Sequence, residues 1–250
     1  MSLLAVAKTD DNIENEKDFV GGGLLESGLY PAEVVLAWLE KKSSGAVFLN
    51  LTIKTDSGQE HRAGLCLASC DAKGNKNYYE TKTGERRYLR GFNTANSLAL
   101  LACGKELGEM DTDQKVINVY NAEAKAEVPT KVEMVMDLLG ARAIFGIQKQ
   151  TVDKTARGGD GQYRSTGETR DTNEIDKVFR EKDRMTTAEI RAQADEAAFI
   201  NVWEQKWAGK TVNKSTVNDA NGAAGAPAKK AASGSGATAP STKPKTSLFN

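Results

Sequence analysis

Cysteine and histidine are scarce in this chain, and their scarcity argues against several classes of protein. The 250 residues include three cysteines, Cys66, Cys70 and Cys103, and one histidine, His61. An odd, small number of cysteines argues against a disulfide framework and predicts a reducing compartment, the cytoplasm. Any histidine-based catalytic triad would depend on His61 alone, so we expect the protein not to be an enzyme.

Long apolar runs and phosphate-loop or metalloprotease motifs are also missing. No stretch reaches the roughly 18 apolar residues that a membrane-spanning helix needs, so we expect no membrane segment. The apolar patch at residues 3–6 follows no basic stretch and is cut short by Asp10 and Asp11, so a secretory signal is not expected. The chain has neither a GxxxxGKS or GxxxxGKT phosphate loop nor an HExxH motif.

Two groups of side chains have the chemistry of metal ligands without the spacing of common metal sites. His61 and the first two cysteines run in the order HxxxxCxxxC, with the third cysteine far along the chain, and this order lacks the paired CxxC knuckles of structural zinc sites. Core thiols and a strand histidine are the alternative. Asp111 and Asp113 lie in a DTD sequence that is more typical of a turn or a cap. We expect no metal and no cofactor.

The formal net charge of zero conceals a separation of charge along the chain. Residues 209–250 contain six lysines and a single acidic residue, Asp219, so the rest of the chain is net acidic. An acidic body repels nucleic acid, and any DNA site on it must be a local basic groove. Residues 209–250 are also poor in large apolar side chains, which predicts disorder.

Alternating apolar and polar residues predict strands. In residues 45–55 the apolar side chains at 47, 49, 51 and 53 share one face, which is the period of a half-buried strand. Turn residues at 56–58 join this strand to another at 59–68, which predicts a hairpin. Residues 155–173 have no apolar face and are predicted to be an exposed loop. Further strands are predicted at 28–40, 116–120, 131–139 and 142–152.

Two helices accompany the strands. The first is predicted at 92–107, with Asn93 or Thr94 as its N-cap. The second is predicted at 186–208, from a capping box of Thr186 and Glu189 to an aromatic end that docks on the strands. We therefore predict an α+β, mainly β fold: an OB-like, closed or nearly closed barrel of about five or six antiparallel strands with an inserted helix. This domain spans 28–208, between a flexible arm at 1–27 and a disordered basic tail at 209–250.

Residues 73–92 form a basic, aromatic segment within the acidic body. Two short strands flank a turn at 81–85, which predicts a projecting hairpin. Cations for phosphates and flat rings for unstacked bases are what a sequence-independent single-strand binder needs. A solvated loop whose tyrosines pack on the strands is the alternative. The predicted nucleic-acid-binding residues are Lys73, Lys76, Tyr78, Tyr79, Lys82, Arg86, Arg87, Tyr88 and Arg90, with Trp38 or Tyr163 as further aromatic contacts.

Several long blocks of sequence resemble one family of phage proteins. In chain order they are DDNIENEKDFVGGGLLESGLY at 10–30, MDTDQKVINVY at 110–120, IQKQTVDK at 147–154, GQYRSTGETR at 161–170 and KPKTSLFN at 243–250. With these blocks the chain resembles the single-stranded DNA-binding proteins of lytic podophages of the Enquatrovirus type, which encode their own virion RNA polymerase. The resemblance implies a protein of the host cytoplasm that coats single-stranded DNA without strong sequence preference. It also implies a role in phage replication, recombination and transcription.

The tail ends in a basic and apolar motif made of Lys243, Lys245, Leu248 and Phe249. We expect this motif to recruit a phage or host RNA polymerase or a replication protein, with the tail giving reach. Tail lysines that touch phosphates and raise non-specific DNA affinity are the competing interpretation. The alternative function is a partner-binding adaptor or transcription activator whose main contact is RNA polymerase. A nuclease is disfavoured, because the sequence shows no convincing cluster of carboxylates or histidines.

Overall fold

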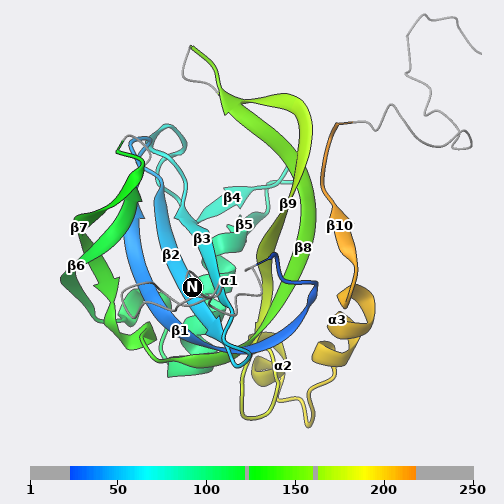
Figure 1. The fold of residues 1–250 in the computed structure, drawn as a ribbon. Coiled ribbons are helices and arrows are strands. Elements are labelled where there is room, and N and C mark those ends of the chain that lie inside the picture. The colour runs from blue at the N-terminus through cyan, green and yellow to red at the C-terminus, as the bar shows by residue number, and fades with distance from the viewer. Residues whose placement is uncertain (1–22, 122–123, 160–162, 218–250) are drawn as a thin grey trace, which may run out of the picture. The chain divides into compact units, whose positions relative to one another are not determined.

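The structure, a computed structural model, describes residues 23–121, 124–159 and 163–217, and over these residues one twisted sheet of eight strands forms the body (Figure 1). The strand pairs in this sheet are antiparallel except for β8 with β10. A separate ribbon consists of β4 (Tyr78–Glu80) and β5 (Arg86–Tyr88). The strands of the sheet are β1 (Gly28–Lys41), β2 (Val47–Thr55), β3 (Glu60–Ala68), β6 (Thr112–Asn121), β7 (Ala126–Val135), β8 (Arg142–Arg157), β9 (Tyr163–Phe179) and β10 (Thr211–Asn213). The α-helices are α1 (Arg90–Leu98), α2 (Thr187–Arg191) and α3 (Phe199–Trp207).

The hairpin of β2 and β3 follows the pattern that the sequence predicts. In β2 the side chains of Leu49, Leu51 and Ile53 are buried, and the strand pairs with β3 along most of its length. Gly58 in the connecting turn has a φ of +85°, a left-handed conformation that a side chain would strain. The predicted strands and the turn between them are confirmed.

β1 shares one of its edges between two partner strands. Its first part pairs with β8, with Leu29 opposite Gly146, and its later part pairs with β7, with Trp38 opposite Met134. The other edge of β1 pairs with β2. β3, β6, β9 and β10 each pair with a single strand and not with one another, so the described strands do not close into a hydrogen-bonded ring. The predicted mainly β, antiparallel fold is confirmed, and no closed barrel is found in the described residues.

α1 lies against two of the unpaired edges, those of β3 and β9. At its start the backbone of Gly91 approaches β3 so closely that a Cβ atom there would lie 2.4 Å from the backbone nitrogen of Cys66. Arg90 reaches the other edge, where its guanidinium lies 2.8 Å from Glu174 and 2.7 Å from Asp176, both on β9. The helix therefore bridges two edges that no strand pairing joins.

Two apolar clusters stabilise the body. The larger cluster brings together the sheet and α1, and includes Ile53, Leu98 and Phe145, each at most 1% exposed. The smaller cluster joins β8 and β9 to α3, where Trp203 meets Phe179 edge-on with ring centroids 6.4 Å apart. The predicted docking of the C-terminal aromatic residues on the strands is confirmed.

The first helix begins and ends earlier than predicted. It begins at Arg90, after Leu89, and continues from α1 as a π-helical turn at Ala99–Cys103. The predicted caps, Asn93 and Thr94, lie inside the helix, so that prediction is wrong. Thr94 donates its hydroxyl hydrogen to the carbonyl of Arg90 at 3.1 Å, which is a bond that threonine also makes within helices.

The predicted helix at 186–208 is two helices, α2 and α3. The capping box of Thr186 and Glu189 is confirmed, but α2 ends at Arg191. The Glu189 carboxylate also accepts hydrogen bonds from the backbone N–H groups of Ala198 and Phe199, at 2.9 and 2.7 Å, at the start of α3. One carboxylate thus serves two helix starts, which a single continuous helix would not allow. No helix in the described residues is long and apolar enough to cross a membrane.

The segment predicted as a loop at 155–173 is instead part of a long hairpin arm. β8 and β9 pair as far as Arg157 opposite Tyr163, and the arm extends away from the rest of the sheet (Figure 1). Both faces of its outer part are exposed, so no apolar face marks the strands in the sequence. The exposed-loop prediction is wrong for this reason.

Ordered contacts extend past both ends of the predicted domain at 28–208. Leu25 is 5% exposed and exchanges two backbone hydrogen bonds with the side chain of Asn173, so the packed body begins before Gly28. At the other end β10 pairs with β8, and the carboxylate of Asp153 accepts hydrogen bonds from residues 215–217. Residues 1–22 of the predicted arm and 218–250 of the predicted tail lie outside the described residues.

Candidate nucleic-acid interface

The basic, aromatic segment forms the predicted hairpin, β4 paired with β5. Tyr78 lies opposite Tyr88 and Tyr79 opposite Arg87. The turn closes through hydrogen bonds between Thr81 and Glu85, and Gly84 adopts a φ of +82° that favours glycine. Turn chemistry between two short runs of β-formers is enough to specify this ribbon locally.

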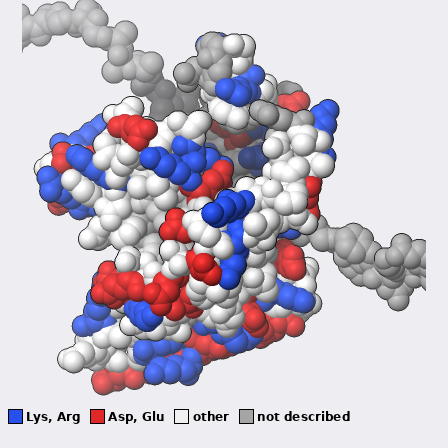
Figure 2. Space-filling model, turned by 90° about the vertical axis from the view of Figure 1, so that its left-hand side faces the viewer, with Lys and Arg blue, Asp and Glu red and all other residues white. Residues whose placement is uncertain are grey.

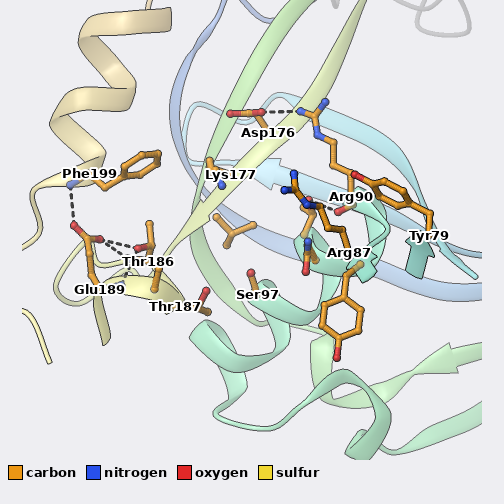
Figure 3. A pocket seen from close by; sticks show the side chains of 15 residues that line it. Tyr79, Arg87, Arg90, Ser97, Asp176, Lys177, Thr186, Thr187, Glu189 and Phe199 are labelled. Atoms are coloured by element: carbon orange, nitrogen blue, oxygen red, sulfur yellow. Dashed lines mark hydrogen bonds and ion pairs between the residues drawn. The ribbon is translucent and has the colours of Figure 1, made fainter. Parts of the chain in front are cut away.

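The ribbon borders a cavity of about 530 Å³, here called the ribbon cavity. Figure 3 shows Tyr79 and Arg87 on one side of it and Phe199 and Glu189 on the other. Its lining comes from the ribbon, α1, β9 and the α2–α3 region, which are far apart in the sequence. The residues used below are Tyr79, Arg87, Tyr88, Arg90, Asn93, Ser97, Asp176, Lys177, Glu189 and Phe199.

A second cavity of about 460 Å³, here called the thiol cavity, also borders the ribbon. Lys73, Lys76 and Tyr78 line it, and Tyr79 lines both cavities. Cys66 and Cys70 line it as well, and both are free thiols. Eight of the nine predicted contact residues therefore line a cavity or contact a residue that does, and Lys82 lies in the turn of the ribbon.

Exposed aromatic rings surround the ribbon cavity. Tyr79 is 49% exposed, Tyr88 is 55% exposed and Phe199 is 38% exposed. Phe92 supports Tyr88 from α1, with ring centroids 5.0 Å apart. These side chains leave flat apolar faces in solvent, which is the arrangement that allows bases to stack.

Most cations on the ribbon are held loosely. Arg86 lies 3.3 Å from Glu80 and Arg87 lies 2.9 Å from Glu85, and all four side chains are more than half exposed. Such surface pairs contribute only about 0–1 kcal/mol, so a phosphate can replace the carboxylate at little cost. Among the described residues, Lys73 and Lys82 have no ion-pair partner. The ribbon therefore presents cations that are available to an anion.

Arg90 has a different role in the structure. It pairs with Glu174 and Asp176, and the second oxygen of Asp176 accepts a hydrogen bond from the indole nitrogen of Trp203 at 2.6 Å. Arg90 and Asp176 lie along one wall of the ribbon cavity (Figure 3), and through Trp203 the network also joins α1 and β9 to α3. Arg90 is thus a positioning residue for the cavity wall as well as a predicted contact.

Glu189 holds the opposite wall in place. Burial favours its neutral form, but hydrogen bonds from Thr186, Phe199 and Ala198 outweigh burial and lower the pKa of Glu189 below its usual value. The charged carboxylate fixes the start of α3 and with it the ring of Phe199. The wall therefore depends on Glu189 staying ionised.

Charges of both signs are mixed on the face of the molecule that carries β6 and β7 and within the ribbon cavity. Figure 2 shows the side of the molecule where β6 and β7 lie, and basic and acidic side chains alternate over it without a large area of one sign. In the ribbon cavity the cations Arg87, Arg90 and Lys177 face the carboxylates of Asp176 and Glu189. Charges of opposite sign offset one another on this face and in the cavity, so neither produces a strong long-range field of one sign.

Sequence reasoning missed the far wall of the ribbon cavity. Lys177 and Phe199 lie about a hundred residues from the ribbon, and no local pattern connects them to it. Tyr163 lies on the hairpin arm, and Trp38 lines a third cavity. Among the described residues no three metal-ligating side chains cluster. The tail motif Lys243, Lys245, Leu248 and Phe249 lies outside the described residues.

Comparisons with known proteins add no assignment to these cavities. Neither the models of known protein families nor the curated proteins give a match to this chain. The resemblance to phage single-stranded DNA-binding proteins stays a prediction from sequence. The case for a function therefore depends on the side chains around the ribbon.

Proposed function

We propose that the protein is a non-enzymatic, largely sequence-independent single-stranded DNA-binding protein that coats and melts DNA in phage replication, recombination and transcription. One observation carries the proposal: the ribbon combines half-exposed tyrosines with loosely paired cations and borders two cavities, with Tyr79 lining both. The tail is proposed to recruit a polymerase or a replication protein.

The chemistry of the ribbon favours a single strand over a duplex. In a single strand the bases are unstacked and present their faces, and each base stacked on a ring contributes about 1–3 kcal/mol. Lys76 and Arg86 lie over the ring of Tyr78, and Arg87 is only loosely paired with Glu85, so we expect these cations to contact the phosphates between such bases. In a duplex the base faces are already stacked, so the rings gain nothing. Binding by rings and phosphates carries little sequence preference.

The fold is proposed to be an OB-like barrel that is left open between β3 and β9. Three features support this. β1, β2 and β3 form an antiparallel meander, and α1 follows β3 after the ribbon. One edge of β1 also pairs with the later strands β7 and β8. OB-folds are partly open barrels that bind oligonucleotides on their strands and loops.

Titration of a labelled oligo(dT) with the full-length protein tests the proposal. We expect the single strand to bind more tightly than a hairpin duplex of the same length. A variant with Tyr79→Ala, Arg86→Gln, Arg87→Gln and Tyr88→Ala is expected to bind weakly and with a flatter salt dependence.

The matched control for this variant changes cations elsewhere on the body. Lys105 and Lys206 are exposed and line neither cavity, so Lys105→Gln with Lys206→Gln is expected to retain tight binding. Absence of single-strand binding in the wild type would refute the function. Unchanged affinity and salt dependence in the fourfold variant would instead refute the placement of the site.

A further inference from the structure

A third cavity, here called the sheet groove, lies over the outer face of β1, β2 and β3. Its volume is about 270 Å³, and β6 lines its side. β6 pairs with β7 alone, so it is not part of the floor. The lining used below consists of Trp38, Asn50, Arg62, Gly64 and Tyr120.

Strand register places the sheet groove next to the thiol cavity. Trp38 pairs with Asn50 and Asn50 with Gly64, which makes one row across the three strands. Two residues along, Glu40 pairs with Phe48 and Phe48 with Cys66 in a parallel row. Alternate residues of a strand share a face, so Gly64 and Cys66 lie about 7 Å apart on the same side of β3. Cys66 lines the thiol cavity, and the two cavities therefore follow one another along one sheet face.

The sheet groove repeats the chemistry of the ribbon. Trp38 is half-buried in its floor and Tyr120 is 61% exposed at its side, so each offers part of a ring to solvent. Arg62 is exposed and has no ion-pair partner among the described residues. Gly64 leaves the floor open, because it has no side chain and the nearest atom to a Cβ there is 3.7 Å away.

Two carboxylates flank this path, and each has a cation beside it. Glu80 lines the thiol cavity and lies 3.3 Å from Arg86. Glu40 lies 2.5 Å from the ammonium group of Lys42 and accepts a hydrogen bond from the Asn50 amide nitrogen at 2.9 Å. The Asn50 side-chain oxygen lies 3.7 Å from the position that a Cβ on Gly64 would take, and both residues line the groove. Lys42 also lies 5.9 Å from the ring centroid of Phe48, in the row between the two cavities. A DNA phosphate that passes over Phe48 therefore lies near the ammonium group of Lys42 as well as the carboxylate of Glu40.

We propose that the sheet groove is a second binding site for the same DNA strand. Single-stranded DNA that leaves the ribbon and the thiol cavity passes over Phe48 into the groove. There Trp38 and Tyr120 stack on bases, and Arg62 contacts a phosphate. The inference rests on the proposed function, and it lengthens the DNA-binding surface of the protein from the ribbon to Trp38 on β1. Single-stranded DNA is favoured as the occupant because the two cavities follow one another along one face of the sheet and because Arg62 has no ion-pair partner among the described residues.

Fluorine NMR of the full-length protein labelled with 5-fluorotryptophan reports on the groove directly. The chain has three tryptophans, and Trp38→Phe assigns the Trp38 resonance. Oligo(dT) of about 16 nucleotides is expected to shift that resonance, while one of about 4 nucleotides binds at the ribbon and leaves it in place. Tyr120→Ala is expected to weaken binding of the longer oligonucleotide by at least about fivefold, and Tyr120→Phe, which keeps the ring, to retain it.

The outcomes separate this inference from the proposed function. If the longer oligonucleotide binds while the Trp38 resonance stays in place and Tyr120→Ala binds as the wild type does, the groove is not a DNA site and the function stands. If neither oligonucleotide binds, both proposals fail. Unfolding curves of Tyr120→Ala that match those of the wild type assign its weaker binding to the lost ring.

Discussion

Truncation of Tyr79 tests ring stacking apart from charge. We expect Tyr79→Ala to weaken binding of oligo(dT) by about 5- to 150-fold, because a base stacked on an aromatic ring contributes about 1–3 kcal/mol and about 1.4 kcal/mol is tenfold. The ring lines both cavities beside the ribbon, so its loss removes a stacking surface from each. Tyr79→Phe keeps the ring and is expected to bind within about threefold of the wild type, within the usual context-dependence of single contacts.

The exposure of Tyr79 also limits how much Tyr79→Ala can lower the free energy of unfolding. Tyr79 is 49% exposed, so about half of its side chain gains nothing from burial. Its strand pairs through the backbone, which alanine retains. We therefore expect the free energy of unfolding to fall by about 1 kcal/mol or less. Urea denaturation followed by tryptophan fluorescence measures this change.

Salt dependence distinguishes the ring from the neighbouring cation. Fluorescence anisotropy of a labelled oligo(dT), titrated between about 50 and 200 mM salt, gives the slope of log affinity against log salt. Tyr79→Ala is expected to leave this slope unchanged, whereas Arg87→Gln is expected to reduce it by about 0.7, the value for one phosphate on a single strand. If Tyr79→Ala is folded and binds with wild-type affinity, the stacking surface is not at the ribbon and the reasoning above is wrong.

Three further variants test the framework around the cavities. Gly91→Ala places a Cβ 2.4 Å from the β3 backbone and is expected to lower the free energy of unfolding by about 1–3 kcal/mol, whereas Gly108→Ala, with no atom within 4 Å, is expected to be close to neutral in the same urea titration. The folded-state pKa of Glu189 is lowered, so its contribution to stability is present above the unfolded value of about 4.3 and is lost as the pH falls through the folded value. At pH 7 the free energy of unfolding from urea titration should therefore be higher for the wild type than for Glu189→Gln, by about 1.5–3 kcal/mol for hydrogen bonds to a charged acceptor. The difference should close in acid, and a constant difference contradicts this. Arg90→Gln breaks two part-exposed ion pairs and is expected to cost about 1 kcal/mol and to change the fluorescence of Trp203, and an unchanged spectrum contradicts the link through β9.

Local signals in the sequence were sufficient where one face of an element is buried or a turn is unambiguous. β2 was predictable because its apolar side chains alternate against a core, and the ribbon was predictable because Gly84 and its neighbours close a turn between short β runs. The capping box of Thr186 and Glu189 is also local, since both of its partners lie within one turn. The ribbon half of the candidate site follows from these same short-range patterns.

Only the tertiary structure decided the features that depend on distant partners. The arm of β8 and β9 has two exposed faces, so its strands lack the alternation that burial imposes. α2 and α3 are separate because Glu189 also caps the start of α3. The far wall of the ribbon cavity, with Lys177 and Phe199, exists because β9 and α3 pack beside α1. The sequence by itself determined the basic and aromatic residues of the ribbon and its turn, because these depend on neighbours a few residues apart. Contacts between segments about a hundred residues apart decided which cavities those residues line.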